Sequence, residues 1–294
     1  MEAQEKEQDA QAAGAARAAS GADAAPGASA STVPGAAATP REETATDRLQ
    51  IVLGREGLDL LRRSTVMVLG LGGVGSNCAV ALARGGVGGL VLVDRDVVGP
   101  SNINRQAVAR VSTLGRDKTE AMRELVADIN PACRVTCLKA FIEKDRVAEQ
   151  LGTLPRPDYV VDAIDTVAQK LAIARWCADE GLREISSMGG ANKIDPTRFR
   201  VSDISRTEVD PLCRVMRKEC RRGIKGLKVL WSDEVPLAVE PIDGPRDHST
   251  RPADKGSILG TMSYIPPVMG QIIAGRVICD LVGLECAQPG RGGW

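Results

Sequence analysis

The sequence is poor in the side chains that build structural metal sites. Of its 294 residues one is a histidine, His248, and none of the eight cysteines belongs to a C-x-x-C pair. Cys133 and Cys137 are spaced as C-x-x-x-C, but no second pair accompanies them. A structural zinc ion usually needs four such ligands, so we expect none. Buried, reduced thiols are the expected state of the cysteines.

Large apolar side chains are almost absent from residues 1–45, which consist mainly of Ala, Gly, Ser, Pro and scattered charges. Such a composition cannot bury enough surface to offset chain entropy, so we predict a disordered tail. The segment also lacks the apolar core of a secretion signal and is too acidic for a typical mitochondrial transit peptide. We therefore expect a cytoplasmic protein, and the alanine-rich start leaves a mitochondrial location as the alternative.

The remainder has the size of one α/β domain. We place this domain at residues 46–284, with a C-terminal part from about residue 195 and a flexible tail at 285–294. Residues 1–47 hold eight acidic and three basic side chains, which leaves 35 basic and 30 acidic side chains in the rest. This excess permits an anionic partner. The most apolar long segment, 265–284, contains two prolines and the charges of Arg276 and Asp280. We interpret it as a buried helix, not a membrane span.

Apolar runs and amphipathic stretches alternate along the domain. Strands are predicted at 65–69, 90–94, 134–140, 158–165 and 183–187, and helices at 47–61, 77–84, 115–130, 145–151 and 166–181. The strands are continuous apolar runs, as in a parallel sheet buried on two faces. The pattern predicts a doubly wound, mostly parallel, Rossmann-like α/β fold. After Gly190 it is less regular, with strands at 199–204 and 227–231, helices at 210–222 and 263–282, and a polar loop at 240–257.

The chain is organised around a glycine-rich turn that follows the first strand. Gly70, Gly72 and Gly75 fit the dinucleotide pattern G-x-G-x-x-G, and Asp94 follows about 20 residues later. Glycines let the backbone approach a phosphate, and the next helix, for which Ser76 is the expected N-cap, points its amides at that phosphate. An acid after the second strand suits the hydroxyls of a ribose. On this pattern alone, a nicotinamide-dependent dehydrogenase is the favoured function.

Further residues favour a triphosphate instead. Gly73 turns the pattern into G-x-G-G-x-G, and Arg105 and Lys118 would neutralise β- and γ-phosphates. Lys118 lies in the first turn of a predicted helix, where a cation is unfavourable unless an anion is bound nearby. Asp165 ends a predicted strand and could hold Mg²⁺ or the nucleotide.

Four blocks occur in a fixed order: G-L-G-G-V-G, D-R-D-V-V-x-x-S-N-x-N-R-Q, Lys118, and D-A-I-D. In these blocks, over about residues 48–190, the sequence resembles the ubiquitin-activating-enzyme-like adenylating superfamily of ThiF type. Within it, the likeness to the tRNA threonylcarbamoyladenosine dehydratases extends to about residue 282. It is carried by D-A-I-D-T-V-x-x-K at 162–170, G-G-A at 189–191, I-D-P-T at 194–197, V-x-D-I at 201–204, D-P-L at 210–212 and G-S-I at 256–258.

The resemblance implies an ATP- and Mg²⁺-dependent, ligase-type enzyme. It would adenylate the carboxylate of a modified adenosine in tRNA, and the adenylate would then be attacked from within the same side chain, with loss of water. The nucleotide-binding positions are Gly70, Gly72, Gly73, Gly75, Asp94, Asp96, Asn102, Arg105, Gln106, Lys118 and Asp165. The catalytic positions are Arg105, Lys118, Asp165 and Arg48. Asp165 would position the magnesium ion, Asp94 the ribose and Asn102 the phosphate chain. Arg48 matches an arginine that reaches ATP from a partner subunit, which implies a homodimer.

A dense basic run follows residue 213, with only Glu219 opposing it. Its members are Arg214, Arg217, Lys218, Arg221, Arg222, Lys225 and Lys228. Charge runs are most often solvated surface. Here the sign, the density and the resemblance together favour contact with tRNA, for which the first five members are the candidates.

Besides the nicotinamide-dependent dehydrogenase, two other functions compete with tRNA modification. An activator of a ubiquitin-like or sulfur-carrier protein would adenylate a C-terminal carboxylate and pass it to a cysteine. Cys177 and Cys213 are the candidates for that role, although neither lies in a recognisable thioester motif. A non-catalytic binding subunit would keep the fold without hydrolysing ATP, but it has no need for Arg105, Lys118 and Asp165 together. We assign no general base and give His248 no role.

Overall fold

The structure is a computed structural model that describes residues 42–221, 223–239 and 259–285. A compact unit begins at Thr44, and the features below belong to it. Several predictions fall outside the described residues: most of the N-terminal tail, Arg222, the loop at 240–257 with His248, the G-S-I motif, Cys286 and the last nine residues.

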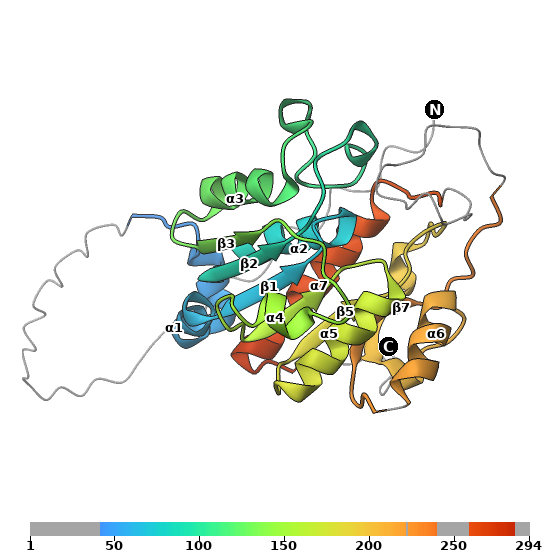
Figure 1. Ribbon diagram of the computed structural model, residues 1–294. Helices are drawn as coiled ribbons and strands as arrows, with labels where there is room; N and C mark the ends of the chain where they lie inside the picture. Colours follow the sequence, from blue (N-terminus) through green and yellow to red (C-terminus); the bar gives the residue numbers. More distant parts are fainter. Residues whose placement is uncertain (1–41, 222, 240–258, 286–294) are drawn as a thin grey trace, which may run out of the picture. The chain divides into compact units, whose positions relative to one another are not determined.

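Within these described ranges, seven strands form one sheet in the order β3-β2-β1-β4-β5-β7-β6 (Figure 1). Their bounds are Thr65–Leu69 (β1), Gly89–Val93 (β2), Arg134–Leu138 (β3), Tyr159–Asp162 (β4), Glu184–Ser187 (β5), Phe199–Asp203 (β6) and Lys228–Ser232 (β7). Neighbouring strands are parallel except β6 and β7, which are antiparallel. The predicted doubly wound, mostly parallel α/β fold is therefore confirmed. The strand order reverses between β1 and β4, where such sheets bind ligands at the carboxyl ends of their strands.

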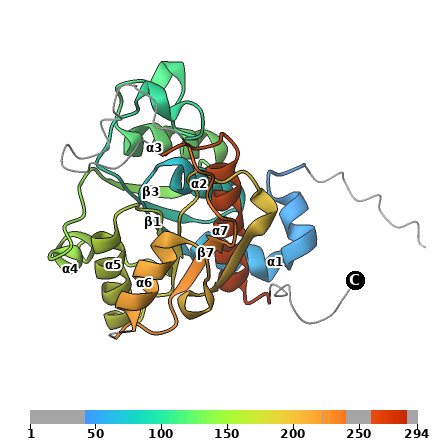
Figure 2. The same ribbon diagram turned by 90° about the vertical axis from the view of Figure 1, so that its right-hand side faces the viewer.

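Helices cover both faces of the sheet. Their bounds are Asp47–Arg63 (α1), Gly73–Arg84 (α2), Lys118–Ile129 (α3), Val147–Leu151 (α4), Val167–Asp179 (α5), Pro211–Cys220 (α6) and Ile265–Val282 (α7). Helices α1, α2, α3 and α7 lie on one face, and α4, α5 and α6 on the other (Figures 1 and 2). In β1, Val66 and Val68 face the first group, whereas Met67 and Leu69 face α4 and α5. This two-sided burial explains why the strands read as continuous apolar runs.

Helix α7 packs closely against α2, as Figure 2 shows. A Cβ atom on Gly270 would lie 2.5 Å from the carbonyl oxygen of Val74, so the absence of a side chain permits the contact. By length and a mean hydropathy of 1.4, α7 alone among the described helices could cross a membrane. Its buried face, however, belongs to the core beside α2. This contact brings the start of α7 to the glycine-rich turn.

Most helices begin within about two residues of the predicted position, but α2 and α3 differ by more. Helix α2 begins at Gly73 with Gly72 as its N-cap, so Ser76 is not the N-cap. The Ser76 hydroxyl instead donates to the Gly72 carbonyl oxygen at 2.6 Å and accepts from the Ala107 amide at 3.0 Å. Helix α3 begins at Lys118 and not at Gly115, because Gly115 has φ +78° and Asp117 occupies the N-cap position.

Candidate functional site

The glycine-rich turn lies between the carboxyl ends of β1 and β4. Gly70 has φ +88°, and a Cβ atom on it would lie 2.9 Å from the carbonyl oxygen of Ala163. On Gly75 the added atom would lie 1.8 Å from the Gly70 carbonyl oxygen. Around a Cβ atom on Gly72, in contrast, no atom from outside the turn lies within 4 Å. Two glycines thus close the turn on itself, while the third leaves open space at the start of α2, where backbone amides favour an anion.

The turn is held from two distant parts of the chain. A Cβ atom on Gly73 would lie 2.6 Å from Pro266 Cβ and 3.2 Å from Arg105 Cγ. The Asn77 side-chain amide donates to the carbonyl oxygens of Gly73, at 2.7 Å, and Arg105, at 2.9 Å. It thereby ties the S-N-x-N-R-Q segment to the turn. No sequence motif marks Asn77 or Pro266, so the sequence predicts neither as a site residue.

Asp94 follows β2 and contacts the turn directly. Its Oδ2 accepts from the Leu71 amide at 2.5 Å, and its Oδ1 accepts from the Asp96 amide at 2.8 Å. Burial raises the pKa of the Asp94 carboxyl, and the charge of Lys118 partly offsets this effect. Each carboxylate oxygen keeps a further lone pair with which to accept a ribose hydroxyl.

Lys118 is the first residue of α3 and its side chain is only 5% exposed. Its Nζ lies 3.1 Å from Asp96 Oδ2, and Arg95 Nε lies 3.3 Å from the other Asp96 oxygen. Asp96 therefore compensates the positive charge of Lys118 at this helix start within the chain. Asp96 in turn links Lys118 to the strand end that carries Asp94.

The three predicted residues of the S-N-x-N-R-Q segment differ in exposure. Asn102 is buried, and its Oδ1 accepts from the Gly99 amide at 3.0 Å. Gln106 is buried too, and within the described part its Oε1 has no hydrogen-bond donor. Arg105 is half-buried, and its Nη1 donates to Ser101 O at 3.0 Å and to Asn104 Oδ1 at 2.8 Å. None of the described carboxylates forms an ion pair with Arg105.

Asp165 lies three residues beyond the end of β4 and is exposed. Its Oδ1 accepts from the Thr166 hydroxyl at 3.2 Å. The intervening Ala163 packs against Gly70 and Gly75, so Asp165 belongs to the same edge of the sheet. In the described ranges, no group of three or more His, Cys, Asp and Glu side chains could hold a metal ion.

Arg48 is not brought to this edge within its own chain. It is exposed near the start of α1. Its neighbour Thr46 lies 3.8 Å from the Cβ position of Gly86, which precedes β2 and so marks the opposite, amino edge of the sheet.

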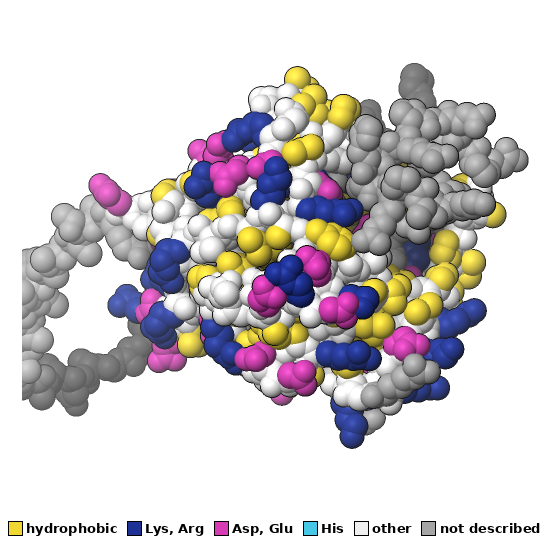
Figure 3. All heavy atoms as spheres, viewed as in Figure 1, with side chains coloured by type: hydrophobic (Ala, Val, Ile, Leu, Met, Phe, Trp, Pro, Cys, Tyr) yellow, Lys and Arg dark blue, Asp and Glu magenta, His cyan; other side chains and the backbone are white. Residues whose placement is uncertain are grey.

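The predicted basic run lies mostly on α6. Cys213, Met216 and Cys220 face the core, while Arg214, Lys218 and Arg221 are exposed on the other side of the helix. Figure 3 shows basic side chains gathered in the region of α6. Described members of the run with partners inside the chain include Arg217, whose Nη1 donates to both oxygens of Thr207, and Lys228, which pairs with Asp280.

Neither candidate for a thioester cysteine is accessible. Cys177 is 1% exposed and Cys213 is 0% exposed. Burial raises the pKa of the Cys213 thiol to about 12, and burial also raises the pKa of Cys177 strongly. Because the thiolate is the nucleophile, both cysteines are inert near neutral pH.

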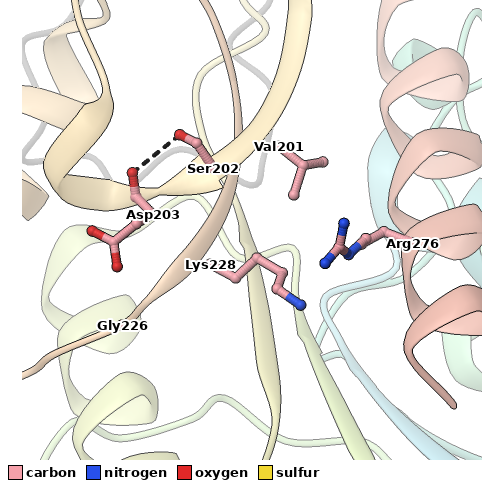
Figure 4. Close-up of a pocket in the computed structure, with 6 residues that line it drawn as sticks. All are labelled: Val201, Ser202, Asp203, Gly226, Lys228 and Arg276. Atoms are coloured by element: carbon pink, nitrogen blue, oxygen red, sulfur yellow. Dashed lines mark hydrogen bonds between the residues drawn. The ribbon is translucent and has the colours of Figure 1, made fainter. Parts of the chain in front are cut away.

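A cavity of about 130 Å³ lies away from the glycine-rich turn, at the amino end of β7 (Figure 4). It is lined by Val201, Ser202, Asp203, Gly226, Lys228 and Arg276. The charged ends of Lys228 and Arg276 face each other across it, and both pair with Asp280. No predicted nucleotide-binding residue lines this cavity.

Comparison with known proteins assigns the sequence to a family. The model of the ThiF family matches residues 46–287. The chain belongs to the ThiF family. Within that family, the chain is 43% identical over 239 residues to the tRNA threonylcarbamoyladenosine dehydratase of Bacillus subtilis strain 168, covering 80% of this chain and 93% of that protein.

A solved structure and a more distant relative complete the comparison. The structure of the Escherichia coli tRNA N6-threonylcarbamoyladenosine dehydratase in complex with ATP has a TM-score of 0.69 and 29% identity, covering 80% of this chain and 92% of that one. The molybdopterin-synthase adenylyltransferase of Escherichia coli strain K12 is 34% identical over 122 residues, which cover 42% of this chain and 48% of that protein.

Proposed function

We propose that the protein is an ATP-dependent tRNA threonylcarbamoyladenosine dehydratase. One observation carries the proposal: the similarity to the Bacillus subtilis dehydratase covers 80% of this chain and 93% of that protein, whereas the match to the molybdopterin-synthase adenylyltransferase covers 42% of this chain and 48% of that protein. The likeness to the dehydratases thus extends well beyond a shared nucleotide-binding core.

We propose distinct roles for the site residues around a bound ATP. Open space beside Gly72 receives the phosphates at the start of α2, and Asp94 accepts the ribose hydroxyls. Arg105 and Lys118 stabilise the negative charge that develops as pyrophosphate leaves. The nucleophile that attacks the adenylate belongs to the same side chain as the adenylated carboxylate, so the attack closes a ring and releases AMP. Orientation therefore supplies much of the rate, and no enzyme cysteine is needed.

Mg²⁺ is the proposed metal, with Asp165 as its protein ligand. Magnesium is commonly bound through one or two carboxylates together with substrate phosphates and water. A single exposed carboxylate at the nucleotide edge, with one hydroxyl as its partner, fits that pattern. When bound, the ion would neutralise charge on the triphosphate.

A homodimer is proposed because Arg48 lies at the amino edge of its own sheet. If Arg48 acts on ATP, it must act on the ATP of a second copy. Exposed apolar side chains next to it on α1, Ile51 at 78% and Val52 at 76%, favour a contact there.

For tRNA, the proposed surface is the outer face of α6. Because Arg217 has partners within the chain, Arg214, Lys218 and Arg221 are the better probes. Reversing all three to Glu is expected to abolish tRNA binding and leave ATP binding unchanged. Reversing the exposed Arg62, Lys144 and Arg156 gives a control with the same change in net charge. Equal tRNA affinity of the two triple variants would remove α6 from the proposal.

The decisive experiment is mass analysis of anticodon-loop nucleosides after incubation of threonylcarbamoyladenosine-modified tRNA with protein and ATP. The expected result is loss of one water from the modified adenosine with release of AMP. Pyrophosphate exchange that requires a small ubiquitin-like protein instead of tRNA would favour the activator function. Binding of NADH in a fluorescence titration would favour a dehydrogenase. We propose a cytoplasmic location, with mitochondria as the alternative, which cell fractionation tests.

A further inference from the structure

A fully buried polar cluster lies directly beneath the nucleotide edge. Lys170 of α5, Asp162 of β4 and Ser186 of β5 are each 0% exposed. Lys170 Nζ lies 3.0 Å from both Asp162 Oδ2 and Ser186 Oγ. The Ser186 hydroxyl donates to the same Asp162 oxygen at 2.7 Å.

The second oxygen of Asp162 reaches the candidate site. Its Oδ1 accepts from the Ile164 amide at 3.1 Å. The preceding Ala163 amide donates to Leu69 O at 2.9 Å, and the Ala163 carbonyl packs against Gly70. One carboxylate therefore connects the buried lysine to the turn at 163–165, which touches the glycine-rich turn and leads to Asp165.

Stability alone does not explain a charged cluster in the core. Burying a carboxylate and an ammonium is costly, and apolar side chains of similar volume often give equal or greater stability. Such groups are informative when they fix one conformation. Here Lys170 and Ser186 satisfy Oδ2 and hold the carboxylate in the orientation that directs Oδ1 at the Ile164 amide.

We infer that Lys170 is a positioning residue for nucleotide binding. Acting through Asp162, it fixes the turn at 163–165 against Gly70 and so sets the place of Asp165. The inference rests on the proposed ATP site, but its structural half concerns the turn alone and can be measured without any ligand.

The chain supplies a matched control in its other buried lysine. Lys193 is 1% exposed and lies 2.8 Å from Asp210 Oδ2 and 2.9 Å from Gly189 O. Asp210 Oδ1 accepts from the Cys213 amide and caps α6. This pair thus has the same chemistry and burial, but it holds the start of α6.

The test compares K170M, K193M and the double variant D162L/K170M by hydrogen–deuterium exchange and by titration with ATP. In K170M, exchange at residues 163–166 is expected to rise and ATP affinity to fall at least tenfold. K193M is expected to raise exchange near 189–193 and 211–213, with less than a twofold change in ATP affinity. The double variant removes both buried charges, so it is expected to fold stably and still bind ATP weakly.

Wild-type exchange at 163–166 and wild-type ATP affinity in the folded double variant would overturn the inference. So would an equal loss of ATP affinity in K193M. If neither Lys170 variant folds, S186A decides, because it removes one hydroxyl and no charge. In S186A, faster exchange of the Ile164 amide than in the wild type is enough to support the inference, and unchanged exchange of this amide contradicts it. Failure of the wild-type protein to bind ATP would refute the proposed function and leave the exchange result intact.

Discussion

At the scale of single residues, the site depends on places where no side chain fits. A Cβ atom on Gly75 would lie 1.8 Å from the Gly70 carbonyl oxygen, whereas nothing lies within 4 Å of the corresponding position on Gly72. G75A is therefore expected to destabilise the fold by about 3 kcal/mol or more. G72A is expected to keep the wild-type melting temperature but to weaken ATP binding, because its methyl group enters the ligand space. Thermal unfolding and ATP titration of both variants distinguish the two effects.

Lys118 and Lys139 lie close together in the fold but differ in their expected roles. Lys118 is buried beside Asp96, whereas Lys139 is 50% exposed and pairs with Asp117 at 2.6 Å. K118M is expected to lower the rate of AMP formation by about 100-fold, since one charge-stabilising donor is lost. K139M should leave the rate within a factor of about two, because exposed ion pairs contribute little. Steady-state AMP release measures both rates, and equal rates would remove Lys118 from the mechanism.

Glu184 makes the unfolding free energy depend on pH. Its Oε1 is buried, with no hydrogen-bond donor in the described part of the chain, although the residue as a whole is half-buried. Burial raises the pKa of the Glu184 carboxyl well above its usual range, and Asp162 adds to this effect. The folded state therefore favours the protonated form, so stability is lost as the pH rises from the unfolded pKa toward the folded one.

E184Q mimics the protonated form and is expected to melt at a higher temperature than the wild type at pH 8, with the difference vanishing near pH 4. Melting curves across that range measure it. A difference that is independent of pH would mean that Glu184 does not titrate in this way.

Some of the site residues can be predicted from the sequence and others cannot, for a physical reason. Gly70, Gly75 and Asp94 are recognisable because a fixed local spacing encodes the turn and the strand end that follows it. Asn77, Pro266 and Lys193 act through contacts between segments far apart in the chain, and such contacts leave no local pattern. Lys170 lies in a motif that carries the resemblance, but its burial and its bond to Asp162 emerge only from the fold.

At the scale of elements, α1 consists of two helical pieces. Gly54 has φ +68° and ψ 177° inside the helix, a conformation that is open almost only to glycine. G54A is therefore expected to destabilise the protein by about 1–2 kcal/mol and to redirect the first piece, which carries Arg48. G275A is the control. It lies in α7 with nothing within 4 Å of its Cβ position and is expected to stabilise by about 0.5–1 kcal/mol. Denaturant unfolding measures both changes.

Element boundaries show where sequence patterns lose information. The strands lie at the predicted places because continuous apolar runs mark a sheet buried on two faces. The start of α2 was predicted too late, since the glycines of the turn read as loop although Gly73 and Gly75 are helical. Glycine weakens a helix, but a glycine is required at position 75 because the Gly70 carbonyl oxygen approaches it closely.

At the scale of the whole molecule, the proposed homodimer, with Arg48 acting on the ATP of its partner, predicts rescue between two inactive variants. R48A and R105A are each expected to be inactive. A refolded equal mixture should recover about a quarter of the wild-type activity, because half of the dimers then contain one intact site of two. Size-exclusion chromatography tests for the proposed dimer, and AMP release measures the rescue. A dimeric mixture without activity would show that Arg48 does not act across the interface.

The packing of Pro266 on Gly73 has a consequence for synthesis on the ribosome. The glycine-rich turn is synthesised early, yet α7, which packs against it, is synthesised nearly two hundred residues later. A nascent chain that ends before α7 therefore exposes an unsupported turn and a bare apolar face on α2. Premature termination before α7 should yield a product that cannot use ATP and that quality control removes.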